Sequence, residues 1–567
     1  MRKPYQICLP ILLVCLVPAV ASAQSFRVQC PTSTITHPAA LNNNNVEPPY
    51  TAPTVLTAPS ATTFQAPSAN VNGAIKCQQV SGGDGYATMA DGTQTFMFSF
   101  GPLSGLADIA NGLPGTGFPK DFNTEYLGTL PLQPGDPATS DGVAAGTWPT
   151  FPISTAGFTY NGAVGLTPDA DAIADGLCTA PCLDGHVDPR QIMDIGVMNG
   201  NIPAPLVAFD EDDEMFLTLT NVGMIMRPDL FEQHTIHFHG YPNASSVYDG
   251  VPDASVAINI GGSFTYYYFA PDAGTYFWHC HITPPEHLQM GMVGQLYVRP
   301  RQNRVPVTNS LYGSLQAQQN DLRTACRRPN DGVLPAVSTT TDILCANPVP
   351  AINTNVNQSN DNVGTALTNP NYGQPQKYAY NDGDGSTAYD TEYALQIHGF
   401  DPNFHFVGMT FNPENFATMK DKYFLLNGRS YPDTVTPGPL ATQSSDGRSH
   451  FSQPLPSIIN IPAGGKALLR IADLDVSEYQ TLASLGIPMH VIGFNAKLLR
   501  DQAGNNLEYY TNSITLGGGE SLDVILDATN KTLYPAGSVF YLYTPNLDHL
   551  SNDAENFGGL MTEVHIN

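Results

Sequence analysis

Charge is scarce in this chain of 567 residues: only 13% of the residues are charged, and positive charge is the scarcer kind. Lysine and arginine together number 23, against 50 aspartates and glutamates, which gives a formal net charge of −27 at pH 7. Nucleic acids and anionic membranes repel such a chain, so the composition argues against both as partners. Glycine (51 residues) and proline (48 residues) are plentiful instead, which favours a loop-rich all-β protein over a helical one.

Long apolar runs are missing after residue 20, so no membrane span is expected. Before that point, Arg2 and Lys3 precede an apolar run over residues 7–20, and Ala21-Ser22-Ala23 is typical of a signal-peptidase site. These features predict a signal peptide over residues 1–23. The mature protein is therefore expected to be exported, to the periplasm or the extracellular space.

Two short segments hold six of the fourteen histidines: residues 234–240, HTIHFHG, and residues 278–292, WHCHITPPEHLQMGM. A trigonal site of two histidines and a cysteine with a weak axial methionine is the blue-copper ligand set. The chain supplies that set in the order His234, Cys280, His287 and Met292. The last three are close enough in sequence for one tight loop to deliver them, while His234 reaches in from a neighbouring strand.

The other four histidines form two His-x-His pairs, His237 with His239 and His279 with His281. Residues i and i+2 of a strand point to the same face, so each pair projects two imidazoles in one direction. Cys280, between the members of the second pair, points the opposite way. One short strand would then hold a copper on one face and offer two ligands to a second metal site on the other.

These two segments resemble the last motifs of the multicopper oxidases, His-Pro-x-His-x-His-Gly and His-Cys-His-Ile-x-x-His-x-x-x-Gly-Met. Thr235 stands where proline is usual, and two extra residues precede His287. The resemblance implies copper as cofactor, oxidation of a small reductant (a phenol or a metal ion) at the type 1 copper, and reduction of O₂ to water. It assigns the type 1 ligands as above, His237 to the type 2 copper, and type 3 ligation to His239, His279 and His281.

Asp249 lies in the segment YDGVP, ten residues after His239. Multicopper oxidases have an aspartate in a similar segment near the type 2 copper, and an acid there can relay protons to bound oxygen. Asp-Gly is also among the commonest turn dipeptides, so a purely structural role is the competing interpretation. Glu286 could hydrogen-bond its neighbour His287, but placement on the surface is the favoured interpretation.

The sequence predicts an all-β protein of two cupredoxin-like domains, each a Greek-key β-sandwich with long loops. Its predicted parts are an N-terminal arm (24–90), a copper-binding domain (91–300) with a long insertion (102–187), a linker (301–379) and a second domain without type 1 copper (380–567). Strands are expected over residues 95–101, 214–221, 264–269, 274–280 and 294–299, and in the second domain over 393–400, 423–428, 466–474, 489–499, 521–527, 538–544 and 560–566.

Cysteine usage fits an exported protein. With Cys8 and Cys15 in the signal peptide and Cys280 on copper, an even set remains: Cys30, Cys77, Cys178, Cys182, Cys326 and Cys345. Pairing of sequence neighbours is the simplest connectivity, and fourteen others stay open.

The second domain has no His-x-His pair, although a trinuclear cluster of this family takes four histidines from each of two facing domains. Its histidines are scattered: His398, His405, His450, His490, His549 and His565. A homo-oligomer could complete the cluster, either as a two-fold dimer or as a trimer. One alternative is a nitrite-reductase-like enzyme with a mononuclear type 2 copper, for which His490 or His549 of a neighbour would serve. Another is a non-enzymatic blue-copper electron-transfer protein.

Overall fold

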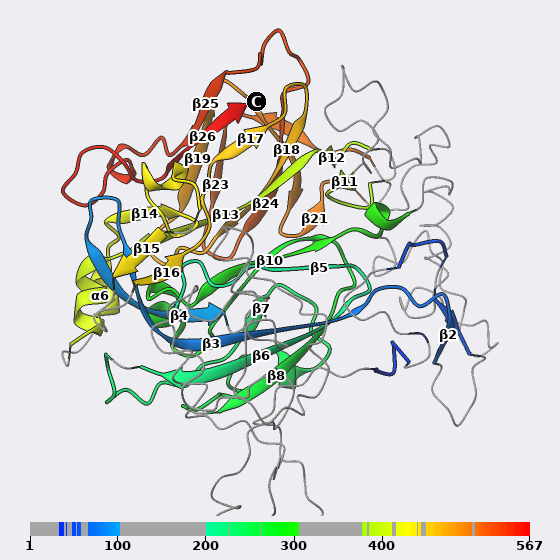
Figure 1. Ribbon diagram of the computed structural model, residues 1–567, viewed down its shortest axis with the longest axis horizontal. Coiled ribbons are helices and arrows are strands. Elements are labelled where there is room, and N and C mark those ends of the chain that lie inside the picture. The colour runs from blue at the N-terminus through cyan, green and yellow to red at the C-terminus, as the bar shows by residue number, and fades with distance from the viewer. Residues whose placement is uncertain are drawn as a thin grey trace, which may run out of the picture.

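The computed structural model describes residues 33–38, 41, 48–52, 54–57, 66–102, 200–305 and 377–567, except 225, 261, 383–384, 411–414, 439, 444–448 and 502–504. Strands dominate these residues and form two β-sandwiches, one above the other in Figure 1. The expected all-β fold is confirmed. The predicted signal peptide, most of the arm, nearly all of the insertion and most of the linker lie outside the described residues. So do five of the six cysteines expected in disulfides and the side chain of Cys77.

The first sandwich consists of two four-stranded sheets, of order β4-β3-β6-β8 and β5-β10-β9-β7. Aromatic and aliphatic side chains fill the space between them, among them Phe98, Phe238, Tyr266 and Trp278. The strands are β3 (Ile75–Thr88), β4 (Gln94–Pro102), β5 (Val207–Asp210), β6 (Glu214–Gly223), β7 (His237–His239), β8 (Ser263–Phe269), β9 (Gly274–His279) and β10 (Val293–Arg299).

The second sandwich packs a sheet of order β14-β13-β18-β24-β20-β21, with β22 beside β20, against a sheet of order β17-β26-β25-β19-β23. Its strands are β13 (Thr391–Phe400), β14 (Tyr423–Leu426), β17 (Ile459–Ile461), β18 (Lys466–Asp473), β19 (Gln480–Leu485), β20 (Met489–Phe494), β21 (Lys497–Leu498), β22 (Tyr509–Thr511), β23 (Ser513–Leu516), β24 (Ser521–Asp527), β25 (Val539–Tyr543) and β26 (Met561–Ile566). The single strand expected over 489–499 is split in two, because Asn495 and Ala496 turn the chain with positive φ.

Short elements complete the described chain. They are β1 (Val55–Leu56) with β2 (Pro67–Ala69), β11 (Lys377–Tyr378) with β12 (Ala388–Tyr389), β15 (Leu440–Gln443) with β16 (Ser449–Gln453), the helices α4 (Pro284–Gln289) and α6 (Pro402–Gly408), and the 3₁₀ turns η1 (Ser246–Tyr248), η2 (Arg301–Arg304), η4 (Phe416–Thr418), η5 (Asp433–Val435) and η6 (Leu547–His549).

The first domain begins earlier than residue 91, the start expected from sequence. β3 begins at Ile75, inside the expected arm, and pairs antiparallel with β4 and parallel with β6. Its interior reads QQVSGGDG, so it lacks the apolar alternation by which a strand is recognised. Its polar residues are buried all the same: Asp84, for example, accepts a hydrogen bond from the Met226 amide at 2.8 Å.

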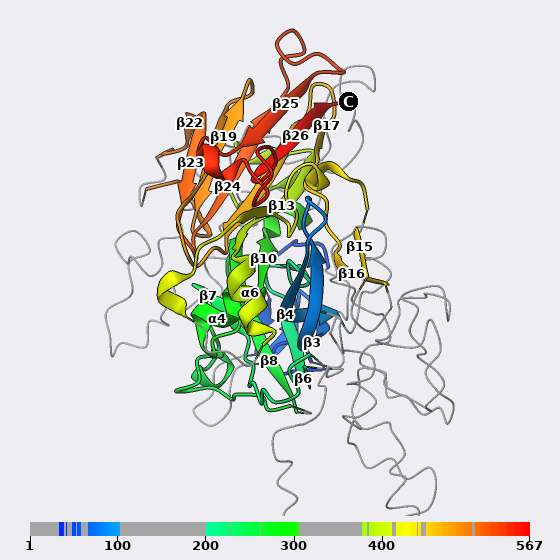
Figure 2. The ribbon, with the colours of Figure 1, turned by 90° about the vertical axis from the view of Figure 1, so that its left-hand side faces the viewer.

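The two sandwiches pack against each other along β9 through hydrogen bonds and through a hydrophobic cluster that contains Phe277 and Leu474, and they lie side by side in Figure 1 and in Figure 2. Thr275 Oγ1 donates to Asp523 Oδ1 at 2.6 Å, and Ser521 Oγ donates to the Thr275 carbonyl at 2.6 Å. Because β9 also leads into the segment of Cys280, the interface fixes the strand on which the histidine-rich segments depend.

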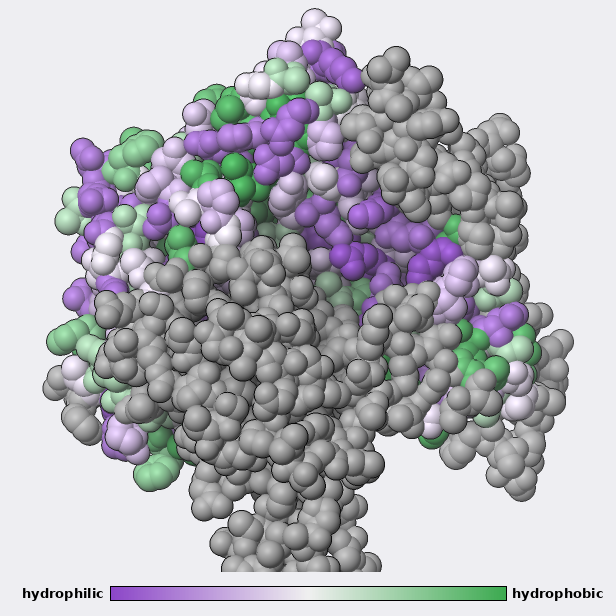
Figure 3. Space-filling model, viewed as in Figure 1, coloured by the Kyte–Doolittle hydropathy of each residue, from purple (hydrophilic) through white to green (hydrophobic). Residues whose placement is uncertain are grey.

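The exposed face of the second sandwich in Figure 3 is largely hydrophilic, with small hydrophobic patches scattered over it. Among the described residues, no helix combines the length and the hydrophobicity that crossing a bilayer requires.

Candidate metal centres

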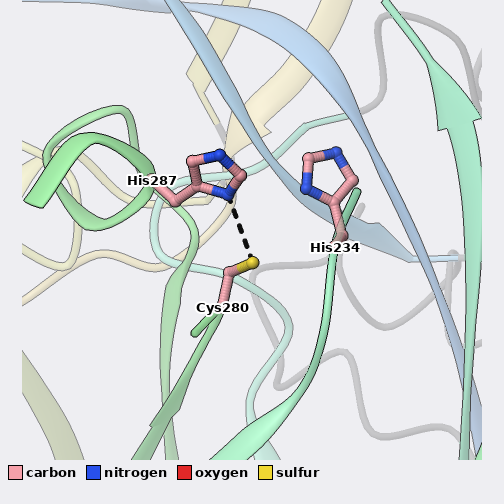
Figure 4. A group of neighbouring side chains, drawn as sticks. All are labelled: His234, Cys280 and His287. Atoms are coloured by element: carbon pink, nitrogen blue, oxygen red, sulfur yellow. Dashed lines mark hydrogen bonds between the residues drawn. The ribbon is translucent and has the colours of Figure 1, made fainter. Parts of the chain in front are cut away.

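His234, Cys280 and His287 form a compact group in the first sandwich. One ligand atom from each lies within 4.8 Å of the others, and all three residues are buried. Three different segments supply them. His234 precedes β7 and forms a β-bridge with Ile258, Cys280 follows the end of β9, and His287 lies in α4. Figure 4 shows the two imidazoles on either side of the sulfur, with His287 Nδ1 at 3.2 Å from Cys280 Sγ.

The sequence had suggested a tight loop around His287, but this residue lies in a short helix. Thr283 adopts a left-handed conformation (φ 37°), and Pro284 and Pro285 then begin α4, where proline is well tolerated. The two residues that this segment has in excess of the family spacing are thus accommodated by one helical turn.

Met292 follows α4 directly and joins two of the ligand segments. Its amide donates to the His287 carbonyl at 2.8 Å, and its carbonyl accepts from the Cys280 amide at 3.1 Å. Met290 is equally buried, but its amide bonds back to Glu286 within the helix. The backbone therefore holds Met292, rather than Met290, beside the cysteine and the histidine.

The donor atoms of this group fit a copper ion. Both ring nitrogens of His234 are fully buried and have no hydrogen-bond partner among the described residues, which is costly for an imidazole. A metal ion that accepts a nitrogen lone pair removes that cost, and two imidazoles with one thiolate are the donors that copper prefers. Gly82 in β3 leaves room for the ring, because a Cβ there would lie 2.8 Å from His234 Cδ2.

Cys280 is prepared to act as a thiolate. Burial alone would raise its pKa, but His287 and the backbone amides of Thr235 and Ile282 lower it below the ordinary value. In return, although burial opposes it, the thiolate and then Glu232 raise the pKa of His287 to about 10. These two shifts favour proton transfer from the thiol to the imidazole, and a metal ion that binds His287 has to displace any proton on the binding nitrogen.

The second group comprises His237, His239 and His279, whose ligand atoms again lie within 4.8 Å of one another. The register of β7 against β9 brings them together, because His237 lies directly opposite His279 and His239 opposite Phe277. The ring of His281 completes the cluster, with its centroid 5.1 Å from that of His237 and 5.5 Å from that of His279. The two His-x-His pairs thus meet on one side of the strands.

Backbone carbonyls orient two of these rings. His237 Nδ1 lies 2.6 Å from the Asp249 carbonyl, and His279 Nδ1 lies 2.7 Å from the Cys280 carbonyl. A carbonyl only accepts hydrogen bonds, so each Nδ1 carries the proton and each Nε2 keeps its lone pair. Such a contact on the far nitrogen is the usual way in which a protein fixes a metal-binding imidazole.

The pKa of His237, of His239 and of His279 lies below its ordinary value, which favours neutral imidazole at pH 7. Burial lowers the pKa of His237 and of His279, and burial together with His237 and His281 lowers the pKa of His239 to about 4. Neutral imidazole is the metal-binding form, so these rings need no deprotonation before they bind. His279 is buried, His237 and His281 are half-buried, and His239 is exposed, so the group opens toward the surface.

Asp249 lies against this group through its main chain as well as its side chain. Its carbonyl holds His237, its Oδ1 lies 3.7 Å from His237 Nδ1, and the same oxygen accepts from Asn243 Nδ2 at 2.6 Å. It is followed by Gly250, whose φ of +83° turns the chain. The turn and the contact with the histidines therefore coexist, and the carboxylate is close enough to exchange protons with that site.

The histidines of the second domain have other partners. His490, which the trimer hypothesis required, pairs with Glu508 at 2.9 Å, and His549 pairs with Gln480 and Glu478. His398 and His405 contact backbone carbonyls of the first domain, and His565 pairs with Glu563. The His450 side chain lies outside the described residues. The second domain approaches the imidazoles at Gly519, where a Cβ would lie 3.1 Å from His239 Nε2.

Two contacts at the first site were not predicted from sequence. The carboxylate of Glu232 lies 3.5 Å from His287 Nε2, whereas the sequence had offered only Glu286 as an acid for this ligand. Thr235 donates its amide to Cys280 Sγ and accepts from the His281 amide on its hydroxyl. Both residues flank His234 in sequence, but nothing in residue type or spacing marks a contact made across the fold.

Residues 184–303 match the family model described as multicopper oxidase. Over 138 residues the chain is 30% identical to the multicopper oxidase MCE of Talaromyces pinophilus, and over 143 residues it is 31% identical to the laccase abr2 of Aspergillus fumigatus. These matches cover 24% and 25% of this chain, and 21% and 22% of the relatives, so the chain aligns with about a fifth of their length. A blue copper oxidase from Nitrosomonas europaea is 20% identical with a TM-score of 0.39, over 65% of this chain and 78% of that one, a likeness too weak to support an argument.

Proposed function

The chain carries a multicopper oxidase domain at residues 184–303, and from this premise we propose that it is an exported copper enzyme that oxidises a small reductant and reduces O₂ to water. One observation supports the proposal above all. Cys280 belongs to the sulfur group (His234, Cys280 and His287), and it is covalently adjacent to His279 of the imidazole group (His237, His239, His279 and His281). Oxidation at one site and oxygen chemistry at the other require such a short connection.

Bound copper would supply one-electron redox chemistry and the binding of oxygen. The chain supplies the donors. His234, Cys280, His287 and Met292 would hold the type 1 copper. His237, His239, His279 and His281 would offer their imidazoles to the second site. Asp249 would supply protons there, since the reduction of O₂ consumes one proton per electron.

Glu232 is the residue we assign to the entry of electrons. Its contact with His287 lowers its pKa, so it is ionised at neutral pH, and its side chain is 24% exposed. It therefore connects the buried ligand with the surface. A carboxylate at this place attracts a metal cation and accepts a hydrogen bond from a phenol, so the site suits both classes of donor.

A second copy of the chain would complete the imidazole group. His239 is exposed, His237 and His281 are half-exposed, and the described histidines of the second domain are bound elsewhere, except for His450, whose side chain is outside that set. Two copies related by a two-fold axis would bring together two equal sets of four histidines. This geometry requires no ligand from the second domain.

A mononuclear copper site is the second candidate. Three imidazoles within 4.8 Å, with the Asp249 carboxylate beside them, suffice for one copper with an acid at hand, as in a nitrite-reductase-like enzyme. If the imidazole group held no copper, the chain would be a blue-copper electron carrier. The number of coppers per chain separates these three functions.

The test combines copper counting, native mass and substrate oxidation on the full chain. The proposal expects more than one copper per chain, a dimer, and O₂ uptake with a phenol or Fe²⁺ that His237→Ala abolishes. The control His565→Ala changes a partly exposed histidine paired with Glu563 and should leave uptake intact. Two coppers per chain with turnover of nitrite but not of O₂ would establish the second candidate, and a single blue copper without turnover would establish the carrier.

A further inference from the structure

We propose that Thr235 is a positioning residue that raises the reduction potential of the type 1 copper through its backbone amide and ties the two copper sites together through its hydroxyl. The inference rests on the proposed function in one respect, that copper binds the His234–Cys280–His287 group. It adds a role for a residue that is not itself a ligand.

Thr235 touches both sites at once. Its amide donates to Cys280 Sγ over 3.4 Å, and its Oγ1 accepts from the His281 amide at 3.0 Å. The residue is fully buried, so water does not compete for either bond. Because Thr235 follows the ligand His234 directly, these two bonds also fix the segment that carries His234 against the segment of Cys280 and His281.

An amide that donates to a thiolate draws electron density away from the sulfur. The sulfur then donates less to the oxidised metal, which depends on it more than the reduced metal does, so the reduction potential rises. The low dielectric of a buried site strengthens this effect. Thr235 thereby makes the copper a stronger oxidant toward its electron donor without occupying a coordination position.

The multicopper oxidase motif that resembles this segment has proline at the position of Thr235, and proline has no amide hydrogen. A chain with proline here would lack both the bond to sulfur and the bond from His281. Thr235 therefore supplies two hydrogen bonds that proline at this position could not supply.

The two functions can be separated by two substitutions. Thr235→Val keeps the amide and the branched shape but loses the hydroxyl, whereas Thr235→Pro loses both bonds. We expect the potential of the blue copper, measured by redox titration of its absorption band, to stay near wild type in Thr235→Val. In Thr235→Pro the ratio of reduced to oxidised copper at a fixed potential should fall about tenfold, equivalent to about 59 mV for one electron. Thr235→Val should lower copper occupancy at the second site only.

A wild-type measurement covers the case in which Thr235→Pro does not fold. Full-length protein labelled with ¹⁵N at threonine should show a ¹⁵N coupling to the oxidised blue copper in pulsed electron paramagnetic resonance. Absence of that coupling, or equal potentials in wild type and Thr235→Pro, would overturn the role of Thr235 while leaving the oxidase proposal intact. A copper-loaded wild type without any blue copper would refute both the role of Thr235 and the oxidase proposal, because both require copper at the His234–Cys280–His287 group.

Discussion

At the scale of single residues, Cys280 is the most demanding position, because its sulfur contacts His287 Nδ1 and the Thr235 amide in a fully buried space. In Cys280→Ser a hydroxyl oxygen replaces the soft ligand. We expect the thiolate-to-copper absorption band to disappear while the protein stays folded, as judged by its circular dichroism and thermal transition. A copper-loaded, oxidised wild type without such a band would contradict the type 1 assignment.

The two buried methionines give a matched pair of residue-scale substitutions. Met292→Leu removes a weak donor that favours the oxidised ion, so the potential should rise while copper stays bound. Met290→Leu removes the same thioether two residues earlier, where the Met290 amide bonds back to Glu286 of α4. This change should alter the reduction potential of the copper little. Redox titration of both variants decides, and a large shift at 290 with none at 292 would reverse the assignment of the axial ligand.

At the scale of elements, the turn after η1 holds the second site in shape, because the Asp249 carbonyl bonds to His237 Nδ1. Gly250→Ala should disturb this turn: φ is +83°, and the new Cβ would lie 1.9 Å from the Ile236 carbonyl oxygen. Gly240→Ala is the control, with a similar φ of +68° but no atom within 4 Å.

Both alanines pay for the left-handed backbone, at about 1 kcal/mol, but only Gly250→Ala adds a clash with the backbone. We therefore expect Gly250→Ala to lower the free energy of unfolding by at least about 1 kcal/mol more than Gly240→Ala, and to lose copper from the second site first. Denaturant unfolding and copper analysis measure the two effects. Equal losses in both variants would show that the Asp249 turn does not hold His237.

The elements also show how far the sequence could lead. The sequence predicted strands close to β13 and β24, and the period-2 argument correctly brought His279 and His281 together with His237. β3 was missed because glycines and buried polar residues fill its interior, and Gly82 is needed there to admit the His234 ring. The contacts of Glu232 and Thr235 depend on packing between distant segments, which local patterns do not encode.

At the scale of the whole molecule, an ion cluster joins the two sandwiches, in which Arg470 is fully buried, Glu392 is mostly buried and Arg299 is one-third exposed. Glu392 of β13 accepts from Arg299 Nη2 of the first sandwich at 2.7 Å and from Arg470 Nε of the second at 3.1 Å. Arg470 is fully buried and also lies over the ring of Tyr297. Arg470 keeps Asp523 at 3.6 Å when Glu392 is changed, so the cost should not exceed the lower end of the about 3–5 kcal/mol that breaking a buried ion pair typically costs.

The cluster predicts how stability changes with acid. Burial would raise the pKa of Glu392, but Arg299 and Arg470 lower it to about 2 from an ordinary value of 4.5. Because the folded-state pKa is the lower one, the stabilisation is complete above pH 4.5 and is lost as pH falls toward 2. Denaturant unfolding should find Glu392→Gln about 3 kcal/mol less stable than wild type at pH 7, with the difference shrinking steadily below pH 4.5.

Asp527→Asn is the control, since its pair with Lys466 is about one-third exposed and should contribute at most about 1 kcal/mol. A difference between wild type and Glu392→Gln that stayed constant from pH 7 to pH 3 would show that the carboxylate is not held ionised by the two arginines.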